Sequence, residues 1–192
     1  MFALSLDDLH LRILGCADGP ASFNAEAAAG LSTISCDPLY RFSAEEIRQR
    51  IRDTSDAVLE QTRRNREEFL WTSIRSIEEL RQLRMSSMGL FLADFEEGKR
   101  QGRYVDAELP NLPFADGDFD IALCSHFLFL YSEQFSEDFH VTAIQEMCRV
   151  AEEVRVFRCW RLEEVLRVDF GRKAPVYDQL RGAILAGDQA TI

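Results

Sequence analysis

The chain has 192 residues, of which 46% are hydrophobic and 29% are charged, and its formal net charge is −11. This length predicts one domain, residues 1–192, with a sizeable core. The acidity disfavours nucleic acid and anionic membranes as partners, because both require a basic surface. No apolar run is long enough for a membrane span, and the first residues lack the pattern of a secretory signal. The five cysteines contain no C-x-x-C pair, which predicts free thiols, no metal site and a cytoplasmic location.

A strand, a glycine turn and a helix open the chain. Residues 11–14 predict a buried strand, and Gly15 begins a turn that leads into a helix extending to about residue 29. This order is typical of a nucleotide-binding βαβ unit, because glycines such as Gly15 and Gly19 let the backbone approach a ligand and the helix N-terminus offers free N–H groups. Ala17 stands where such patterns have a further glycine, so an ordinary strand-to-helix turn is the alternative.

A carboxylate follows the second predicted strand. Thr33–Cys36 predicts this strand, which ends at Asp37 because Pro38 has no N–H group to continue a sheet. Asp37 lies 22 residues after Gly15, close to the spacing at which a βαβ unit places an acidic side chain beside a bound ribose. We predict that its carboxylate accepts hydrogen bonds from the ribose hydroxyls. The alternative is an ordinary turn aspartate.

Residues 43–103 predict a helical insertion. They hold 12 acidic and 12 basic side chains and are therefore neutral, unlike the rest of the chain. Ser43 and Glu46 have the spacing of a capping box, and the apolar residues that follow recur at helical spacing. The insertion is longer than the single crossover helix that a βαβ unit needs. It is either an enlarged crossover or a cap that covers the ligand and excludes water.

The second half of the chain predicts alternating strands and helices. Residues 104–107, 121–124 and 153–157 predict strands, and residues 142–151 predict a helix. This alternation predicts an α/β fold with a mostly parallel sheet covered on both faces. Residues 158–192 predict helical or irregular structure, which would leave the C-terminal edge of the sheet incomplete.

Three stretches, in this order, resemble the class I S-adenosylmethionine-dependent methyltransferases. They are residues 14–19, Asp37 at the end of the second strand, and residues 112–120, which run into residues 121–126. The third stretch is the most specific. The resemblance implies a Rossmann-like, doubly wound sheet, S-adenosyl-L-methionine as cofactor, and methyl transfer to a small or medium-sized molecule.

The resemblance also assigns roles around the first turn. It implies that Gly15, Ala17 and Gly19 line the amino-acid end of the cofactor and that Asp37 holds the ribose. The family often has an acidic residue two positions before the first glycine, and this position is apolar here. Asp18 either substitutes for that residue or caps the first helix.

Further roles follow at the ends of the third and fourth strands. Glu108 or Asp106, together with the backbone of Leu109, is implied to lie near the adenine. Ser125 and His126 are implied to face the cleft where the methyl group is presented. An acceptor that keeps its proton at neutral pH would require a general base.

His126 and His140 are the candidates for that base. The ordinary alternatives are that His126 caps the strand end and that His140 lies on a helix surface.

Two other functions share parts of the pattern. A non-catalytic binding or scaffold protein on a degenerate methyltransferase fold would explain the altered glycine motif. A nicotinamide-dependent oxidoreductase would share the two glycines and the acidic residue, but it does not predict residues 112–120.

Overall fold

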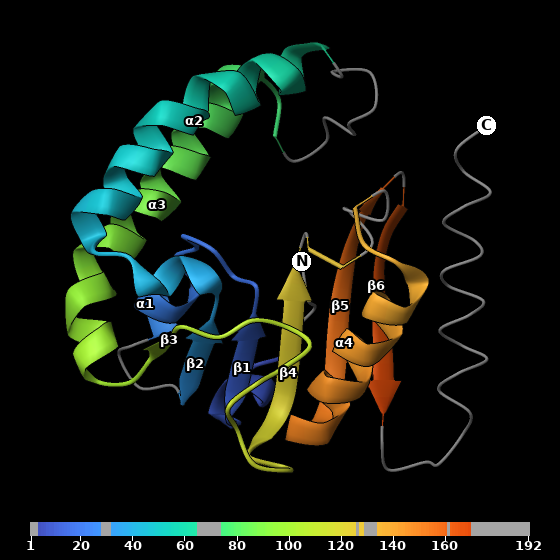
Figure 1. Cartoon of the computed structure of the whole chain (residues 1–192). Coiled ribbons are helices and arrows are strands. Elements are labelled where there is room, and N and C mark those ends of the chain that lie inside the picture. The colour runs from blue at the N-terminus through green and yellow to red at the C-terminus, as the bar shows by residue number, and fades with distance from the viewer. Residues whose placement is uncertain are drawn as a thin grey trace.

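The computed structural model describes residues 4–27, 32–64, 74–125, 127–128, 134–160 and 162–169. A six-stranded sheet with the order β3-β2-β1-β4-β5-β6 forms its centre (Figure 1). Strands β1 to β5 are parallel, and β6 runs antiparallel to β5. The chain therefore has an α/β fold with a mostly parallel sheet. The strands are β1 (Ile13–Cys16), β2 (Thr33–Cys36), β3 (Tyr104–Val105), β4 (Phe119–Ser125), β5 (Ala151–Trp160) and β6 (Leu162–Asp169).

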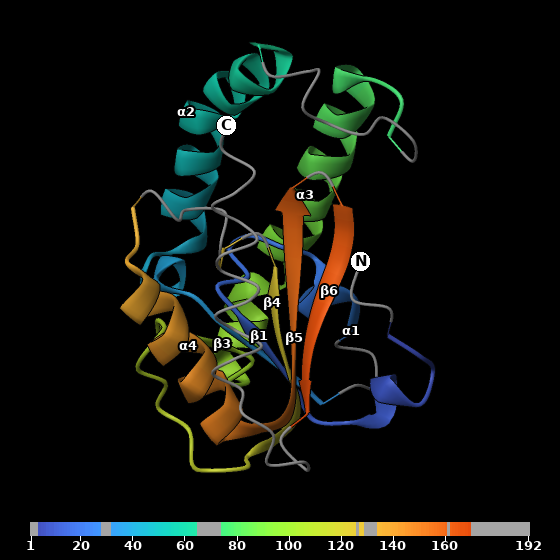
Figure 2. The same cartoon turned by 90° about the vertical axis from the view of Figure 1, so that its right-hand side faces the viewer.

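Helices cover both faces of the sheet. Helix α4 lies on one face and α1 on the other, as the view along the sheet edge shows (Figure 2). Apolar residues of the strands alternate between these two layers, so Leu14 and Cys16 pack on the α4 side, whereas Ile13 packs on the α1 side. No helix in the described part of the chain is long and apolar enough to cross a membrane. The α-helices are α1 (Phe23–Ala27), α2 (Ala44–Arg64), α3 (Ile77–Arg100) and α4 (Glu137–Val150).

The first strand and helix are shifted from their predicted positions. Gly15 lies inside β1 rather than in the turn, and α1 begins only at Phe23. The reason is the intervening backbone, in which Ala17 and Gly19 have positive φ angles of 56° and 57°, a conformation that a right-handed helix does not contain. Residues 28–31, where the predicted helix was to end, lie outside the described residues. The prediction of β2, by contrast, is confirmed at both ends.

The C-terminal edge of the sheet differs most from the prediction. Residues 158–160 continue β5, and residues 162–169 form β6, which pairs with β5 at eight positions. The prediction that this segment is helical or irregular was therefore wrong. Its apolar residues are spaced so that they fit a helix or a strand, and the free edge of β5 favours the strand because it offers unpaired backbone groups. Residues 170–192 lie outside the described residues.

The predicted insertion contains α2 and α3, which pair as a helical hairpin. Its far end extends beyond the carboxyl edge of the sheet (Figure 1). The capping box at the start of α2 is confirmed, because the N–H of Ser43 donates to Glu46 Oε2 at 2.8 Å. An aromatic cluster fastens the base of the hairpin to the sheet edge. Its four rings, with neighbouring centroids 5.0 to 5.9 Å apart, belong to Tyr40, Phe91, Phe95 and Tyr104.

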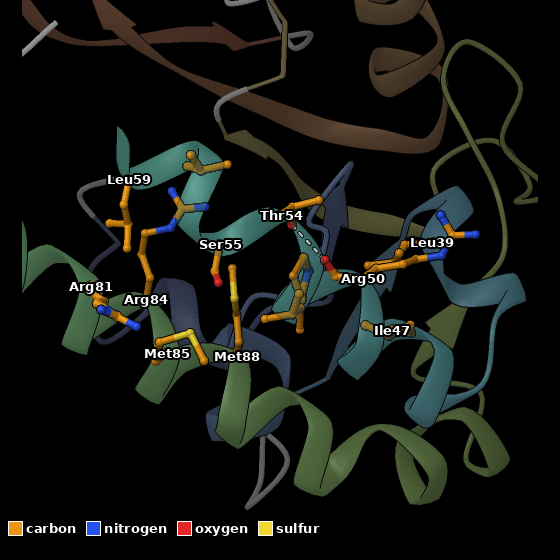
Figure 3. Close-up of a pocket in the computed structure, with 13 residues that line it drawn as sticks. Leu39, Ile47, Arg50, Thr54, Ser55, Leu59, Arg81, Arg84, Met85 and Met88 are labelled. Atoms are coloured by element: carbon orange, nitrogen blue, oxygen red, sulfur yellow. Dashed lines mark hydrogen bonds between the residues drawn. The ribbon is translucent and has the colours of Figure 1, made fainter. Parts of the chain in front are cut away.

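A pocket of about 270 Å³ lies between the two helices of the hairpin (Figure 3). Its walls come from α2 and α3, and Pro20 and Leu39 line it from the loops that follow β1 and β2.

The free thiols predicted from the sequence are found in the described part of the chain. Four cysteines whose side chains are described are buried and unpaired, and they are Cys16, Cys36, Cys124 and Cys148.

Candidate functional site

The site forms where three central strands end. Cys16, the last residue of β1, is in register with Cys36 on one side and Cys124 on the other. The residues that follow these strands therefore emerge at one edge of the sheet. β1 also lies where the strand order changes direction, since β2 and β3 lie on one side of it and β4 and β5 on the other. In parallel α/β sheets, ligands bind outside the carboxyl ends of the strands at this position.

The loop after β1 is tied to the loop after β2. The N–H of Ala17 donates to the carbonyl of Cys36 at 2.9 Å, and the hydroxyl of Tyr40 donates to the carbonyl of Gly19 at 2.8 Å. A Cβ atom built on Gly19 would meet no other atom within 4 Å. The backbone at Gly19 therefore borders open space, where a ligand can approach it.

Asp37 holds the same loop through its side chain. Its Oδ2 accepts the N–H of Gly19 at 2.9 Å, and its Oδ1 accepts the N–H of Leu39 at 2.7 Å. Burial raises the pKa of Asp37, while the two amide hydrogen bonds and Arg41 oppose this rise. Each carboxylate oxygen has two lone-pair positions. One position on each oxygen is used by these amides, so acceptor capacity is left for two further donors.

The carboxylate of Asp18 lies against the backbone of Gly15, the first glycine of the motif. Its Oδ2 accepts the hydroxyl of Ser35 on β2 at 2.6 Å. A Cβ atom at Gly15 would lie 1.8 Å from this Oδ2, so the missing side chain makes room for the carboxylate. Asp18 precedes α1 by several residues and bonds to β2, so the hypothesis that it caps this helix was wrong. Burial, reinforced by the charge of Asp37, raises the pKa of Asp18 to about 6.

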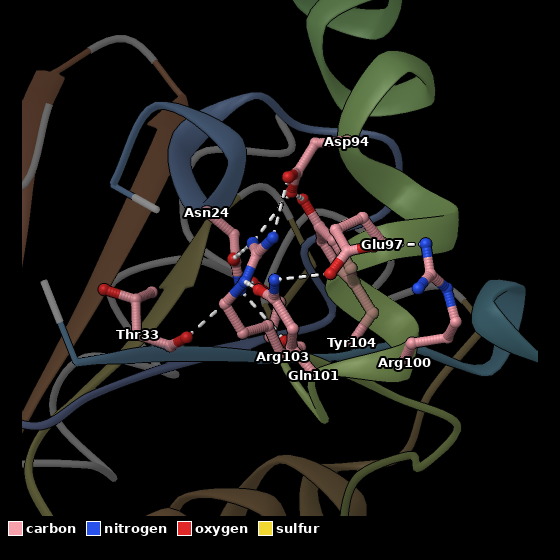
Figure 4. A network of polar contacts seen from close by, with 9 residues as sticks. Asn24, Thr33, Asp94, Glu97, Arg100, Gln101, Arg103 and Tyr104 are labelled. Atoms are coloured by element: carbon pink, nitrogen blue, oxygen red, sulfur yellow. Dashed lines mark hydrogen bonds and ion pairs between the residues drawn. The ribbon is translucent and has the colours of Figure 1, made fainter. Parts of the chain in front are cut away.

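A chain of polar contacts connects Asp18 and Ser35 to α3. Asn24 donates from Nδ2 to the Ser35 hydroxyl at 3.2 Å and to the carbonyl of Arg103 at 3.0 Å. The guanidinium of Arg103 donates back to Asn24 Oδ1 at 2.6 Å and pairs with Asp94 at 2.7 Å, as Figure 4 shows. Tyr104 donates its hydroxyl to the same Asp94 carboxylate at 2.9 Å. This network joins the loop after β1, strand β2 and the base of the hairpin.

The residues predicted near an adenine lie after β3. Asp106 is exposed and lies 3.6 Å from the guanidinium of Arg41. Glu108 is exposed and forms a backbone bridge with Asn111. Leu109 is only 6% exposed and packs into the core on the α4 side. Any contact of Leu109 with a ligand would therefore come from its backbone.

The stretch from residue 112 to residue 120 is fixed by two side chains of α4. Glu146 accepts the N–H of Leu112 at 2.8 Å. Arg149 donates to the carbonyls of Leu112 at 3.2 Å and Phe114 at 2.8 Å. Gly117 has a φ of 70°, which explains the glycine in this tight turn. The loop that leads into β4 therefore has its shape set by α4.

The predicted residues at the end of β4 are described in part. Ser125 is half-buried and is the last residue of the strand. His126 lies outside the described residues, so its role stays a prediction. His140 is only 2% exposed, in α4, and its ring contacts those of Phe135 and Phe139. The alternative that His140 lies on the helix surface was therefore wrong, and burial lowers the pKa of His140.

Two residues of this site were missed by sequence reasoning. Ser35 holds the carboxylate of Asp18, and Tyr40 holds the carbonyl of Gly19. A serine in the middle of an apolar strand was the available signal for Ser35. Tyr40 gave no such signal, because a tyrosine after a turn proline is ordinary and its role depends on how the chain folds back.

Comparisons with known proteins identify a relative of this chain. No family model matches the chain, and no solved structure matches it significantly. The uncharacterized protein MJ0045 of Methanocaldococcus jannaschii is 31% identical over 159 residues, which cover 82% of this chain and 71% of that protein. At this identity and coverage, the chain belongs to the same protein family as MJ0045 of Methanocaldococcus jannaschii.

Proposed function

We propose that the chain is a methyltransferase that uses S-adenosyl-L-methionine and acts on a small or medium-sized molecule. The observation that carries this proposal is the pairing of Asp37 with the N–H of Gly19 at 2.9 Å, at the edge where the strand order changes direction. The strand order of β1 to β5 and the antiparallel β6 agree with the Rossmann-like sheet that the resemblance implies. The loop from residue 112 to residue 120 supports the same resemblance to class I S-adenosylmethionine-dependent methyltransferases.

The described residues fit the proposed cofactor in three respects. Asp37 keeps acceptor capacity for two ribose hydroxyls, as its hydrogen bonds leave lone pairs on both oxygens. Open space borders Gly19. The carboxylates of Asp18 and Asp37 give the site a negative charge, which suits a ligand with a sulfonium and an ammonium group.

The residues of this chain have binding and positioning roles in the proposed reaction. When bound, the cofactor supplies an electrophilic methyl group on its sulfonium. Asp37 holds the ribose and so fixes the direction of this group, because orientation governs the rate of an in-line displacement. Asp18 faces the cationic amino-acid end. Ser125 borders the place of the acceptor, and His126 is the predicted base for an acceptor that keeps its proton.

Two features favour the alternative, a non-catalytic binding protein on the same fold. The carboxylate of Asp18 fills the space over Gly15, so a ligand reaches that backbone only if Asp18 moves. Ala17 has a φ of 56°, which is unfavourable for a residue with a side chain. Both features lie at the amino-acid end of the proposed cofactor. These two features affect how tightly the amino-acid end of the cofactor binds. They leave the hydrogen bonds of Asp37 unchanged.

Calorimetry with S-adenosylhomocysteine tests the cofactor. We expect the wild-type protein to bind it and Asp37→Ala to lose at least about tenfold in affinity, the equivalent of one charge-assisted hydrogen bond. Asp53→Ala is the matched control, since Asp53 is exposed on α2, belongs to neither of the loops after β1 and β2, and accepts a hydrogen bond from Gln49 at 2.7 Å. Thermal unfolding of both variants shows whether they fold. The absence of binding to the wild type, or equal affinity of a folded Asp37→Ala, would contradict the proposal.

A second measurement separates the two functions. The protein is incubated with cell extract and S-adenosylmethionine that has a labelled methyl group, and the labelled products are identified. A labelled small molecule supports methyl transfer. Binding of S-adenosylhomocysteine without any labelled product across a broad range of acceptors supports the non-catalytic alternative. Fluorescence titration with a reduced nicotinamide dinucleotide tests the oxidoreductase hypothesis, for which tight binding is required.

A further inference from the structure

The pocket between α2 and α3 combines an apolar lining with positive charge. Leu59, Met85 and Met88 belong to its apolar lining, contributed by both helices of the hairpin (Figure 3). Methionine side chains adapt to irregular apolar shapes. The volume of about 270 Å³ is at the lower end of ligand pockets and has room for roughly nine water-sized groups. The pocket therefore fits a small, largely apolar molecule.

Three arginines line the same pocket, and no acidic residue does. Arg81 lies 3.9 Å from Asp56, a loose pair whose carboxylate is 86% exposed. Arg50 lies 4.0 Å above the ring of Phe42. Among the described residues, no carboxylate forms an ion pair with Arg50 or Arg84. The pocket is thus positively charged in a chain whose net charge is −11.

This arrangement favours the binding of a negatively charged group. Arg50 comes from α2 and Arg81 and Arg84 come from α3, so the pairing of the two helices gathers like charges around an apolar space. Their mutual repulsion weakens with salt, but it is not offset by a carboxylate in the pocket. Guanidinium groups bind carboxylates and phosphates through two parallel hydrogen bonds. An anionic group is therefore the natural complement of this pocket.

We propose that the pocket between α2 and α3 binds a small amphiphilic anion, with an apolar body of roughly nine non-hydrogen atoms and an anionic end held by Arg84. The pocket adjoins the candidate site. Pro20 directly follows Gly19, and Leu39, which lines the pocket, donates its N–H to Asp37 at 2.7 Å. The anion is the methyl acceptor of the proposed reaction, and this last assignment rests on the proposed function.

Octanoate is the probe, and 1-octanol is its neutral counterpart with the same chain. By calorimetry, octanoate binds the full chain at least about tenfold more tightly than 1-octanol, the factor expected for one charge-assisted contact. In amide NMR spectra, the resonance of Leu39 shifts on addition of octanoate. Equal affinity for the two probes, or no binding of octanoate, overturns the proposal.

Matched double variants test the arginines. Arg50→Gln with Arg84→Gln removes two charges from the pocket, and octanoate affinity falls at least about tenfold. Arg52→Gln with Arg100→Gln removes the same charge from the same two helices outside the pocket, where both arginines pair with glutamates. This control retains wild-type affinity. An equal loss in both double variants assigns the effect to net charge and overturns the proposal.

A third variant tests the apolar space without changing charge. Ser55→Trp fills the pocket from α2 and abolishes octanoate binding, and unaltered binding in a folded Ser55→Trp overturns the proposal. The proposed function is tested separately by S-adenosylhomocysteine. Octanoate binding without S-adenosylhomocysteine binding supports the pocket and overturns the cofactor assignment. Binding of S-adenosylhomocysteine without octanoate binding supports the cofactor assignment and overturns the proposal for the pocket.

Discussion

The carboxylate of Asp18 lies against the backbone of Gly15, so closely that a Cβ atom there would be 1.8 Å from Asp18 Oδ2. A glycine in a nucleotide-binding pattern is usually explained by the approach of a ligand. Here the chain's own carboxylate takes that space and is held in it by Ser35. Gly15 and Asp18 are therefore coupled through space, and the first two predictions concern this pair.

Gly15→Ala destabilises the protein by about 1–3 kcal/mol, because it displaces the Asp18 carboxylate and breaks a partly buried hydrogen bond. In an Asp18→Ala background the same substitution costs less than about 1 kcal/mol, since the obstructing atom is gone. Urea unfolding of the four proteins in this double-mutant cycle measures the coupling. Equal costs in the two backgrounds would show that Gly15 is needed for another reason.

Asp18→Asn changes how stability depends on pH. The pKa of Asp18 is raised from 3.8 to about 6, so the folded protein binds the proton more tightly than the unfolded chain. Protonated Asp18 therefore stabilises the folded protein at about pH 4. As pH rises through about 6, up to about 3 kcal/mol of the free energy of unfolding is lost.

Asp18→Asn does not lose stability in this way, because an amide side chain does not titrate. The difference in unfolding free energy between wild type and Asp18→Asn, measured in urea from about pH 4 to about pH 7.5, shifts in favour of Asn as pH rises. Titration of the Asp18 carboxyl by NMR gives the midpoint directly. A difference that stays constant over this range would contradict the raised pKa.

Ala17→Gly stabilises the protein by about 0.5–1 kcal/mol, because Ala17 has a φ of 56° that costs glycine little. The matched control is Ala93→Gly, at an exposed position inside α3, which costs about 1 kcal/mol. The two substitutions are chemically identical and have opposite expected signs. Thermal unfolding of both variants checks them, and destabilisation by Ala17→Gly would show that its methyl group makes a favourable contact.

Arg103→Met costs about 2–4 kcal/mol, because it leaves Asp94 without its guanidinium in a largely buried network and removes a partner of Asn24. In this pair the two side chains are 14% and 20% exposed. Arg12→Met is the control, since Arg12 pairs with Asp120 at 2.8 Å but is 49% exposed, and we expect it to cost less than about 1 kcal/mol. Equal losses in urea unfolding would mean that burial does not govern these two ion pairs.

The sequence predicted elements best where a local signal marks both ends. Pro38 ends β2 because it has no N–H group, and Ser43 with Glu46 begins α2 through a capping box that forms as expected. The segment from residue 158 to residue 169 has no such marker. Its apolar spacing allows either type of element, and its strand depends on the neighbouring edge of β5.

The candidate site was predictable only at the level of chain position. Asp37 and Gly19 were placed at adjacent strand ends from their spacing, and they form a direct hydrogen bond. The coupling of Gly15 with Asp18 was not predictable, because it depends on the rotation of one side chain in the folded loop. The pocket arginines belong to two helices whose facing sides are set by packing, so no spacing along the chain brings them together.

The Ser22 N–H donates to the Ser87 hydroxyl at 3.1 Å, and this contact marks how far up α3 the hairpin is fastened to the body of the protein. Residues 77–86 continue beyond it over a length of about 15 Å. The base of the hairpin is therefore fixed to the body of the protein by the aromatic cluster and by Ser22, whereas residues 77–86 project past these contacts.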